Sequence, residues 1–192
     1  MKKIVPFFLI LVIFSAQNLF AQEKYEKESR INKREVPENA KKLIDPISDK
    51  KKLKWYHEIG LNSESIEAKY KRKEIQYSVE FDMTGNIADV EMKVNWEGLN
   101  ENLKKAITLQ LNKDCENHKI IKVQKQHTGT EANLTKLLNS EKESPENTIK
   151  YELIVRCSQQ KSINLFEYLF DEQGQIVSTS KIIFKNSSHL EY

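Results

Sequence analysis

A seven-residue turn signature occurs twice in this chain and constrains its fold more than any other feature. Residues 81–87 read Phe-Asp-Met-Thr-Gly-Asn-Ile, and residues 170–176 read Phe-Asp-Glu-Gln-Gly-Gln-Ile. In each copy an aspartate opens a type I turn, and a glycine follows where a left-handed backbone is needed, which is typical of a bulged β-hairpin. A repeat of this kind decides the architecture, so we expect two related halves.

The segments around both signatures alternate apolar and polar residues, the pattern of strands with one buried face. Two segments instead have helical spacing, at about 37–50 and 101–116. Short turns join the strands, which predicts an antiparallel sheet with helices on one face and the other face open. The expected strands are 53–61, 66–71, 75–81, 88–96, 120–127, 149–157, 165–170 and 176–184.

These patterns predict an α+β fold of two tandem repeats, each a helix followed by an antiparallel sheet. Between the expected strands of the second repeat lies an insertion with a short amphipathic run and an acidic tail, which we expect to be a surface excursion. The expected organisation is a signal peptide at 1–21, a flexible lead-in at 22–34, a first repeat at 35–97, a second repeat at 98–185 with the insertion at 130–148, and a tail at 186–192.

The first 21 residues have the pattern of a secretory signal peptide. Lys2 and Lys3 precede an apolar run at residues 4–14, and Ala21 precedes the expected cut. The run is too short to span a bilayer, although a retained membrane anchor is the alternative. Cleavage would lower the formal net charge from +3 to +1, because two lysines and no acids are lost. Because no basic surplus remains to neutralise phosphates, we expect no nucleic-acid partner. Because the apolar run is short and is removed with the signal peptide, we also expect no stable membrane insertion after cleavage.

Short motifs in both halves resemble the PepSY-like, or beta-lactamase-inhibitor-like, module of secreted bacterial proteins. The resemblance covers about residues 35–185 and departs from the family in the insertion, in Pro46 and in the absence of a second Val-Pro and a second Trp. It implies binding or inhibition of other proteins from an open sheet face, and it supplies no catalytic residues. The motifs that carry it are Val36-Pro37, Leu53-Lys54-Trp55, Tyr77-Ser78-Val79-Glu80-Phe81-Asp82 with Gly85, Tyr151, and Phe170-Asp171 with Gly174.

The two cysteines are candidates for a disulfide. Cys115 lies on the core-facing stripe of the expected second helix, and Cys157 lies on the apolar row of a strand in the same half. Export would place them in an oxidising compartment. A disulfide between them is therefore expected, with two buried free thiols as the alternative.

No arrangement of residues indicates catalysis, a cofactor or a metal. The chain lacks the sequence motifs of serine hydrolases, zinc proteases, phosphate loops and dinucleotide sites. His118 follows Cys115 closely, but no second pair of ligands stands at zinc-site spacing. Glu80, Asp89 and Glu91 share the open face, and we interpret them as a solvated charged surface.

One group of residues departs from the alternating pattern. When the two signatures are aligned, Leu165 and Leu169 are predicted to face outward. Glu167 lies between them on the same expected strand, and Ile154 lies on the neighbouring strand. Apolar residues rimmed by charge often mark a protein contact. Two interpretations remain open: these four residues contact a partner protein, or the insertion covers them through leucines of its amphipathic run.

The sequence therefore predicts an exported, non-catalytic module that binds or inhibits another protein through its open sheet face. One alternative is a small-ligand carrier or enzyme with a site between the halves, which requires a deep pocket with convergent polar groups. Another is a structural envelope component, or a homodimer joined through the last strands.

Overall fold

The computed structural model describes residues 22–24, 27–49, 52–60, 63–140, 142–159 and 162–183. Within these residues a single ten-stranded sheet runs through the molecule in the order β1-β10-β9-β8-β7-β6-β5-β4-β3-β2. The two expected half-sheets thus join, because β6 pairs with β7. All neighbours are antiparallel except β1 and β10, which are parallel. The expected signal peptide and tail lie outside the described residues.

The first half of the sheet is built around the first turn signature and the second half around the second. Strands β2 to β6 belong to the first half, and β7 to β10 belong to the second. The first-half strands are β2 (Lys27–Ile31), β3 (Lys54–Ile59), β4 (Glu64–Arg72), β5 (Ile75–Phe81) and β6 (Ile87–Lys93). The second-half strands are β7 (Asn117–Thr128), β8 (Thr148–Gln159), β9 (Ser162–Asp171) and β10 (Ile176–Ile182), with β1 (Gln22–Lys24) at the edge.

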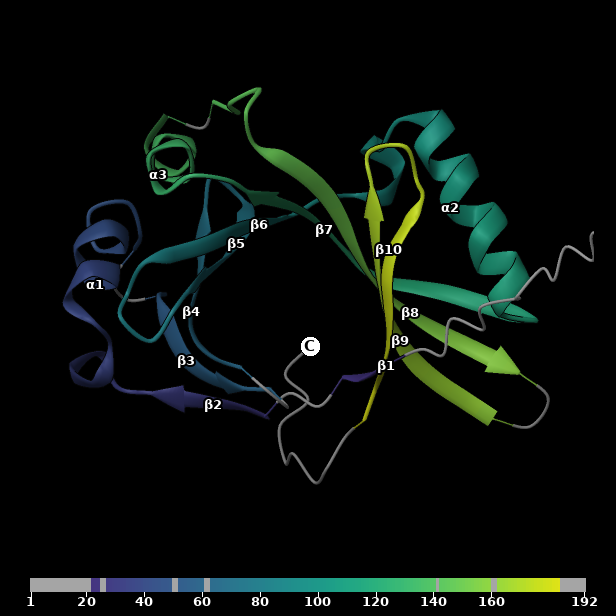
Figure 1. Ribbon diagram of the computed structural model, residues 1–192, viewed down its shortest axis with the longest axis horizontal. Coiled ribbons are helices and arrows are strands. Elements are labelled where there is room, and N and C mark those ends of the chain that lie inside the picture. The colour runs from purple at the N-terminus through teal and green to yellow at the C-terminus, as the bar shows by residue number, and fades with distance from the viewer. Residues whose placement is uncertain are drawn as a thin grey trace, which may run out of the picture.

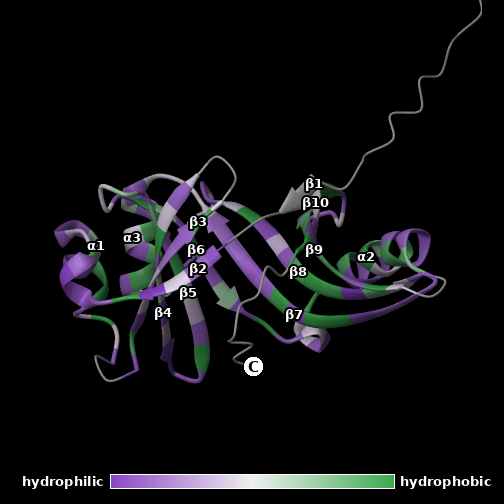
Figure 2. Cartoon of the chain, turned by 90° about the horizontal axis from the view of Figure 1, so that it is seen from below, coloured by the Kyte–Doolittle hydropathy of each residue, from purple (hydrophilic) through white to green (hydrophobic). Residues whose placement is uncertain are grey.

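The helices lie on the outer, convex side of the curved sheet, which leaves the concave side as the open face (Figure 1). Helix α1 (Glu38–Ile44) and helix α3 (Glu131–Ser140) cover the first half, and α2 (Glu101–Asp114) covers the second. The same division is visible from below, with α1 and α3 at one end of the molecule and α2 at the other (Figure 2). The prediction of an α+β fold with helices on one sheet face and the other face open is confirmed.

Each turn signature packs beneath the start of a helix. Gly85 and Gly174 have positive φ angles of 90° and 78°, as the turn requires. A Cβ atom added at Gly85 would lie 2.7 Å from Pro37 Cβ, and one added at Gly174 would lie 2.6 Å from Ala106 Cβ. Both glycines are therefore needed for backbone conformation and for the close approach of the helix.

Two separate hydrophobic cores fill the space between the sheet and the helices. The first contains Phe81 and Val79 beneath α1, and it also receives Leu134, Leu137 and Leu138 of α3. The second lies beneath α2 and is closed by aromatic residues of β9. Helix α2 begins as expected, since the Asn100 side chain accepts a hydrogen bond from the backbone N–H of Asn102.

Three sequence-based expectations need correction. Residues 27–34, predicted within a flexible lead-in, form strand β2 paired with β3 and then a 3-10 turn (Lys33–Glu35). The first helix ends at Ile44 rather than near residue 50, because Pro46 lacks the N–H that would extend it. The insertion is not a surface excursion, because α3 buries its apolar stripe in the core of the first half.

Candidate functional site

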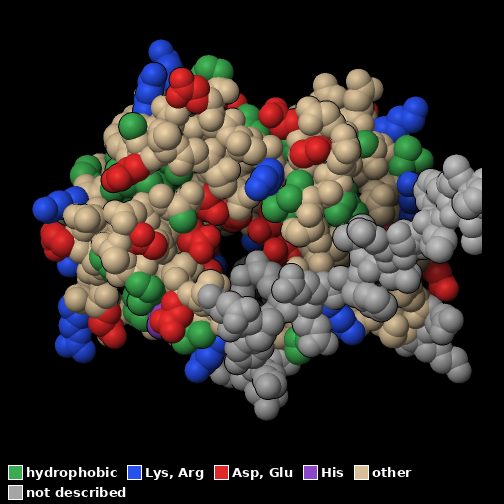
Figure 3. Space-filling model, viewed as in Figure 1, with side chains coloured by type: hydrophobic (Ala, Val, Ile, Leu, Met, Phe, Trp, Pro, Cys, Tyr) green, Lys and Arg blue, Asp and Glu red, His purple; other side chains and the backbone are tan. Residues whose placement is uncertain are grey.

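The open face carries a group of carboxylates that the strand register brings together. Glu67, Glu80 and Asp89 are direct neighbours across β4, β5 and β6, and Glu28 is the neighbour of Glu58 across β2 and β3. Acidic side chains gather around the hollow in the middle of this face (Figure 3). We call this group the acidic cluster: Glu28, Glu58, Glu67, Glu80, Asp89, Glu91 and Glu152.

One part of the acidic cluster is neutralised from within the chain. Lys69 Nζ lies 2.5 Å from Glu28 Oε2 and 2.8 Å from Glu67 Oε2, and Ser78 Oγ donates a hydrogen bond to Glu67 Oε1. Burial acts to raise the pKa of Glu67, but the Lys69 ammonium and the hydrogen bonds outweigh it, so the pKa falls below its usual value. Glu67 is therefore held as a charged carboxylate although it is only 8% exposed.

In the central part of the acidic cluster, no described cation contacts Asp89 or Glu91 directly, and Lys122 pairs with the neighbouring Glu152. Asp89 Oδ2 and Glu91 Oε2 accept hydrogen bonds from the amides of Gln126 (3.0 Å) and Gln124 (2.7 Å). No described lysine or arginine forms an ion pair with either carboxyl group. Burial, followed by repulsion from neighbouring carboxylates, raises the pKa of Asp89 and of Glu91 well above the usual range, although Lys122 acts in the opposite direction at Glu91.

The interpretation of Glu80, Asp89 and Glu91 as a solvated surface is therefore wrong. Asp89 is only 8% exposed and Glu91 is half-buried. The concave curvature of the sheet and the long amides of β7 shield them from water, which alternation along one strand does not reveal. A usable signal was present in the sequence, since the acids of this cluster recur at the outward positions of five predicted strands.

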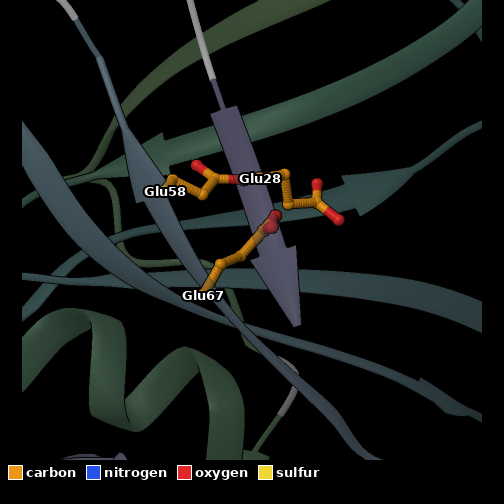
Figure 4. A group of neighbouring side chains, drawn as sticks. All are labelled: Glu28, Glu58 and Glu67. Carbon is orange, nitrogen blue, oxygen red and sulfur yellow. The ribbon is translucent and has the colours of Figure 1, made fainter. Parts of the chain in front are cut away.

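Three carboxylates at the β2 side of the acidic cluster come close enough to be considered as metal ligands. One oxygen from each of Glu28, Glu58 and Glu67 lies within 4.8 Å of the others, and the three side chains come from three adjacent strands (Figure 4). Oxygen ligands of this kind suit a hard cation such as Ca²⁺. The Lys69 ammonium already contacts two of the three, so it provides the positive charge there.

The structure places the four predicted contact residues next to the acidic cluster. Ile154, Leu165, Glu167 and Leu169, which we call the contact set, are half-buried on the open face. Leu169 is the cross-strand neighbour of Glu152, so the contact set adjoins the acidic cluster directly. Helix α3 does not cover the contact set, because its leucines pack in the first core on the opposite face.

The disulfide lies on the helix side of the sheet, away from this surface. Cys115 ends α2 and is bonded to Cys157 of β8. Its role is to tie α2 to the sheet of the second half.

The described histidines form no metal site with cysteine. His57 is partly buried and its Nε2 lies 3.1 Å from Glu64 Oε2, so it is a partnered residue near the surface. His127 is fully buried in the core side of β7, where burial lowers its pKa. Neither residue reaches the open face.

Apart from the hollow of the open face, two surface pockets formed by described residues lie beside helices, away from the junction of the two halves. One is lined by α1 and Lys33, and the other by the end of α2 together with Gln159 and Ser162 at the ends of β8 and β9. Neither involves the acidic cluster. Among the described helices, none has the length and apolar character needed to cross a bilayer.

The chain was compared with known proteins. Neither a protein-family model nor a curated protein matches it. A DUF2874 family protein from Bacteroides uniformis is 11% identical, with a TM-score of 0.52 over 76% of this chain and 89% of its own. A provisionally assigned periplasmic protein from Bacteroides eggerthii is 9% identical, with a TM-score of 0.52 over 76% of this chain and 88% of its own. Likenesses at such identities show the fold alone.

A BLIP-like protein from Bacteroides fragilis also resembles the chain. It is 14% identical, with a TM-score of 0.49 over 80% of this chain and 92% of its own. A score at this level carries no argument about function.

Proposed function

We propose that this chain is an exported, non-catalytic module that binds another protein through the open face of its sheet. The observation that carries the proposal is the contact set, whose apolar side chains stand on a face that no described helix covers. Apolar side chains grouped on an uncovered face and rimmed by charge often mark a protein contact. The adjoining acidic cluster would add charge selectivity to such a contact.

We also propose that the two halves are related PepSY-like copies. Support comes from the equivalent place of Gly85 and Gly174, each beneath the start of a helix, and from equivalent hydrogen bonds in the two turns. In each turn, the aspartate side chain (Asp82 or Asp171) accepts hydrogen bonds from the backbone N–H groups two and four residues later.

Export to the periplasm or beyond is part of the proposal. Strand β1 begins at Gln22, the residue expected first after signal cleavage. One of the structural neighbours bears a provisional periplasmic assignment. N-terminal sequencing of the protein from the cell envelope should read Gln-Glu-Lys, and an intact Met1 would contradict export with cleavage.

Affinity capture with matched variants tests the binding role. Wild type, Leu165→Asp/Leu169→Asp and the control Leu109→Asp would each be exposed to envelope extracts of the source organism. Leu109 is 55% exposed on α2, on the helix side of the sheet. The proposal predicts a protein that wild type and Leu109→Asp retain and the open-face variant loses, with all three equally folded by circular dichroism. Identical retention by all three would contradict it.

A homodimer through the last strands is less well supported. The outer edge of β10 pairs with β1 in parallel, so that edge is already occupied within the chain. The small-ligand or enzyme alternative lacks support from the two surface pockets, which lie away from the middle of the sheet.

A further inference from the structure

The acidic cluster contains two buried carboxyl groups whose electrostatic surroundings are opposite. Glu67 and Asp89 are each 8% exposed and are two strands apart in the same cross-strand row. Glu67 contacts the Lys69 ammonium at 2.8 Å, whereas no described basic side chain pairs with Asp89. The pKa of Glu67 is lowered and that of Asp89 is raised, so the internal cation separates the two cases.

A second observation indicates that the site around Asp89 and Glu91 is incomplete. Gln124 is 6% exposed, and its Nε2 donates to Glu91 Oε2, while its Oε1 is buried and has no hydrogen-bond partner. Its cross-strand neighbour on β8 is Glu152, so the carboxamide lies among carboxylates of the acidic cluster. Buried acceptors are nearly always paired, so the carboxamide of Gln124 is only half satisfied within the described residues.

Lys122 Nζ lies 3.7 Å from Glu152 Oε1 and acts on Glu91, yet the pKa of Glu91 stays raised. A group that brings further positive charge and several hydrogen-bond donors would therefore fit this site. A guanidinium offers five N–H donors in a planar fork that suits carboxylate and carbonyl oxygens, and it tolerates desolvation better than an ammonium. A metal ion fits less well, because it needs several ligands within a few ångströms. The described carboxylates that approach one another so closely are Glu28, Glu58 and Glu67, where Lys69 already supplies the charge.

We propose that the centre of the acidic cluster, formed by Asp89, Glu91 and Gln124, is the docking site for an arginine side chain of the partner protein. The inference rests on the proposed function, since it names the chemistry of the partner at the same face. Leu169 adjoins Glu152 across the strands, so the partner segment presents an arginine close to an apolar side chain that meets the contact set.

The probes for the test are two acetylated octapeptides, one alternating arginine with serine and the other alternating citrulline with serine. Citrulline keeps the shape of arginine and lacks its charge. Binding of each fluorescently labelled peptide to the full exported chain would be measured by anisotropy at low salt, with CaCl₂ alone measured by calorimetry. The variant is Asp89→Asn/Glu91→Gln. The charge-matched control is Glu97→Gln/Glu101→Gln, whose side chains are exposed beside and within α2 on the helix side.

The proposal predicts that the arginine peptide binds, that the citrulline peptide does not, and that Asp89→Asn/Glu91→Gln weakens binding about tenfold or more. The control should bind like wild type, which separates this site from general attraction between charges. Equal binding of the citrulline peptide, indifference to the variant, or binding of Ca²⁺ at this site instead of the peptide would overturn the inference. If the arginine peptide does not bind while Leu165→Asp/Leu169→Asp still abolishes capture of a partner, the arginine docking site is wrong. The proposed binding function of the open face would then still stand.

Discussion

The two halves of the sheet are alike on the helix side and different on the open side. In each half a glycine turn fits beneath the start of a helix, and aromatic residues of the preceding strand close the core. On the open side the first half carries most of the acidic cluster, whereas the second half carries the contact set. The difference teaches that folding constrains the helix side, while the open side was free to take on separate chemistry in each half.

Removal of a core aromatic residue from either half should have the largest effect on stability. Phe81→Ala and Phe170→Ala each delete a side chain that is fully buried beneath a helix. Each should lower the free energy of unfolding by about 3–5 kcal/mol, because a cavity replaces the ring. Urea unfolding followed by tryptophan fluorescence would measure both. If one substitution costs less than about 1 kcal/mol, the two halves do not have equivalent cores.

Loss of the disulfide should affect the second half selectively. The bond between Cys115 and Cys157 spans a separation of 42 residues, and the chain-entropy model gives about 4 kcal/mol for a loop of this length. In Cys115→Ser/Cys157→Ser, amide hydrogen exchange should accelerate in α2 and β8 and change less in β4 and β5. Equal acceleration throughout the sheet would show that the halves unfold as one unit.

Alanine at the two turn glycines should destabilise both halves to a similar degree. Gly85→Ala and Gly174→Ala each place a Cβ on a positive-φ residue against a helix. Strain of this kind costs about 1–3 kcal/mol. Thermal unfolding would measure it, with Gly98→Ala as control, since a Cβ at Gly98 meets no atom within 4 Å. A cost confined to one turn would break the equivalence of the helix sides.

Neutralising the centre of the acidic cluster should have a smaller effect that depends on pH. The folded-state pKa values of Asp89 and Glu91 lie above their unfolded values, so the folded state binds more protons. Their contribution to stability is therefore retained below the ordinary carboxyl pKa of about 4 and is lost as pH rises through the raised pKa values.

Asp89→Asn/Glu91→Gln should consequently have a higher free energy of unfolding than wild type at pH 8, and the difference should be smaller at pH 4. Chemical denaturation at the two pH values would measure the difference. A difference that is the same at both values would show that the two carboxyl groups are not repelled in the folded protein.

Local features of the fold could be predicted from the sequence. The turn signatures and the N-cap at Asn100 are set by neighbours along the chain, and the structure has them where expected. In β5 the inward positions Tyr77, Val79 and Phe81 are buried as expected, whereas Ile75 is exposed and Ser78 is buried. The pairing of Cys115 with Cys157 was also expected, since both positions face the same helix–sheet interface.

The features that escaped prediction depend on residues distant in sequence. Strand β2 forms because its backbone finds a partner in β3, which its charged sequence does not reveal. Helix α3 packs on the first half although it is inserted in the second, because the junction of β6 with β7 brings it there. The burial of Asp89 requires the amide of Gln126, 37 positions away.

Site-specific photo-crosslinking in the cell tests the central claim most directly. A benzophenone amino acid would replace Leu169 on the open face or, in a second strain, Leu109 on the helix side. The account predicts a protein adduct of defined mass from position 169 that is absent from position 109 and is lost when Asp89→Asn/Glu91→Gln is added. An adduct from position 109 with none from position 169 would contradict the claim that the open face is the binding surface.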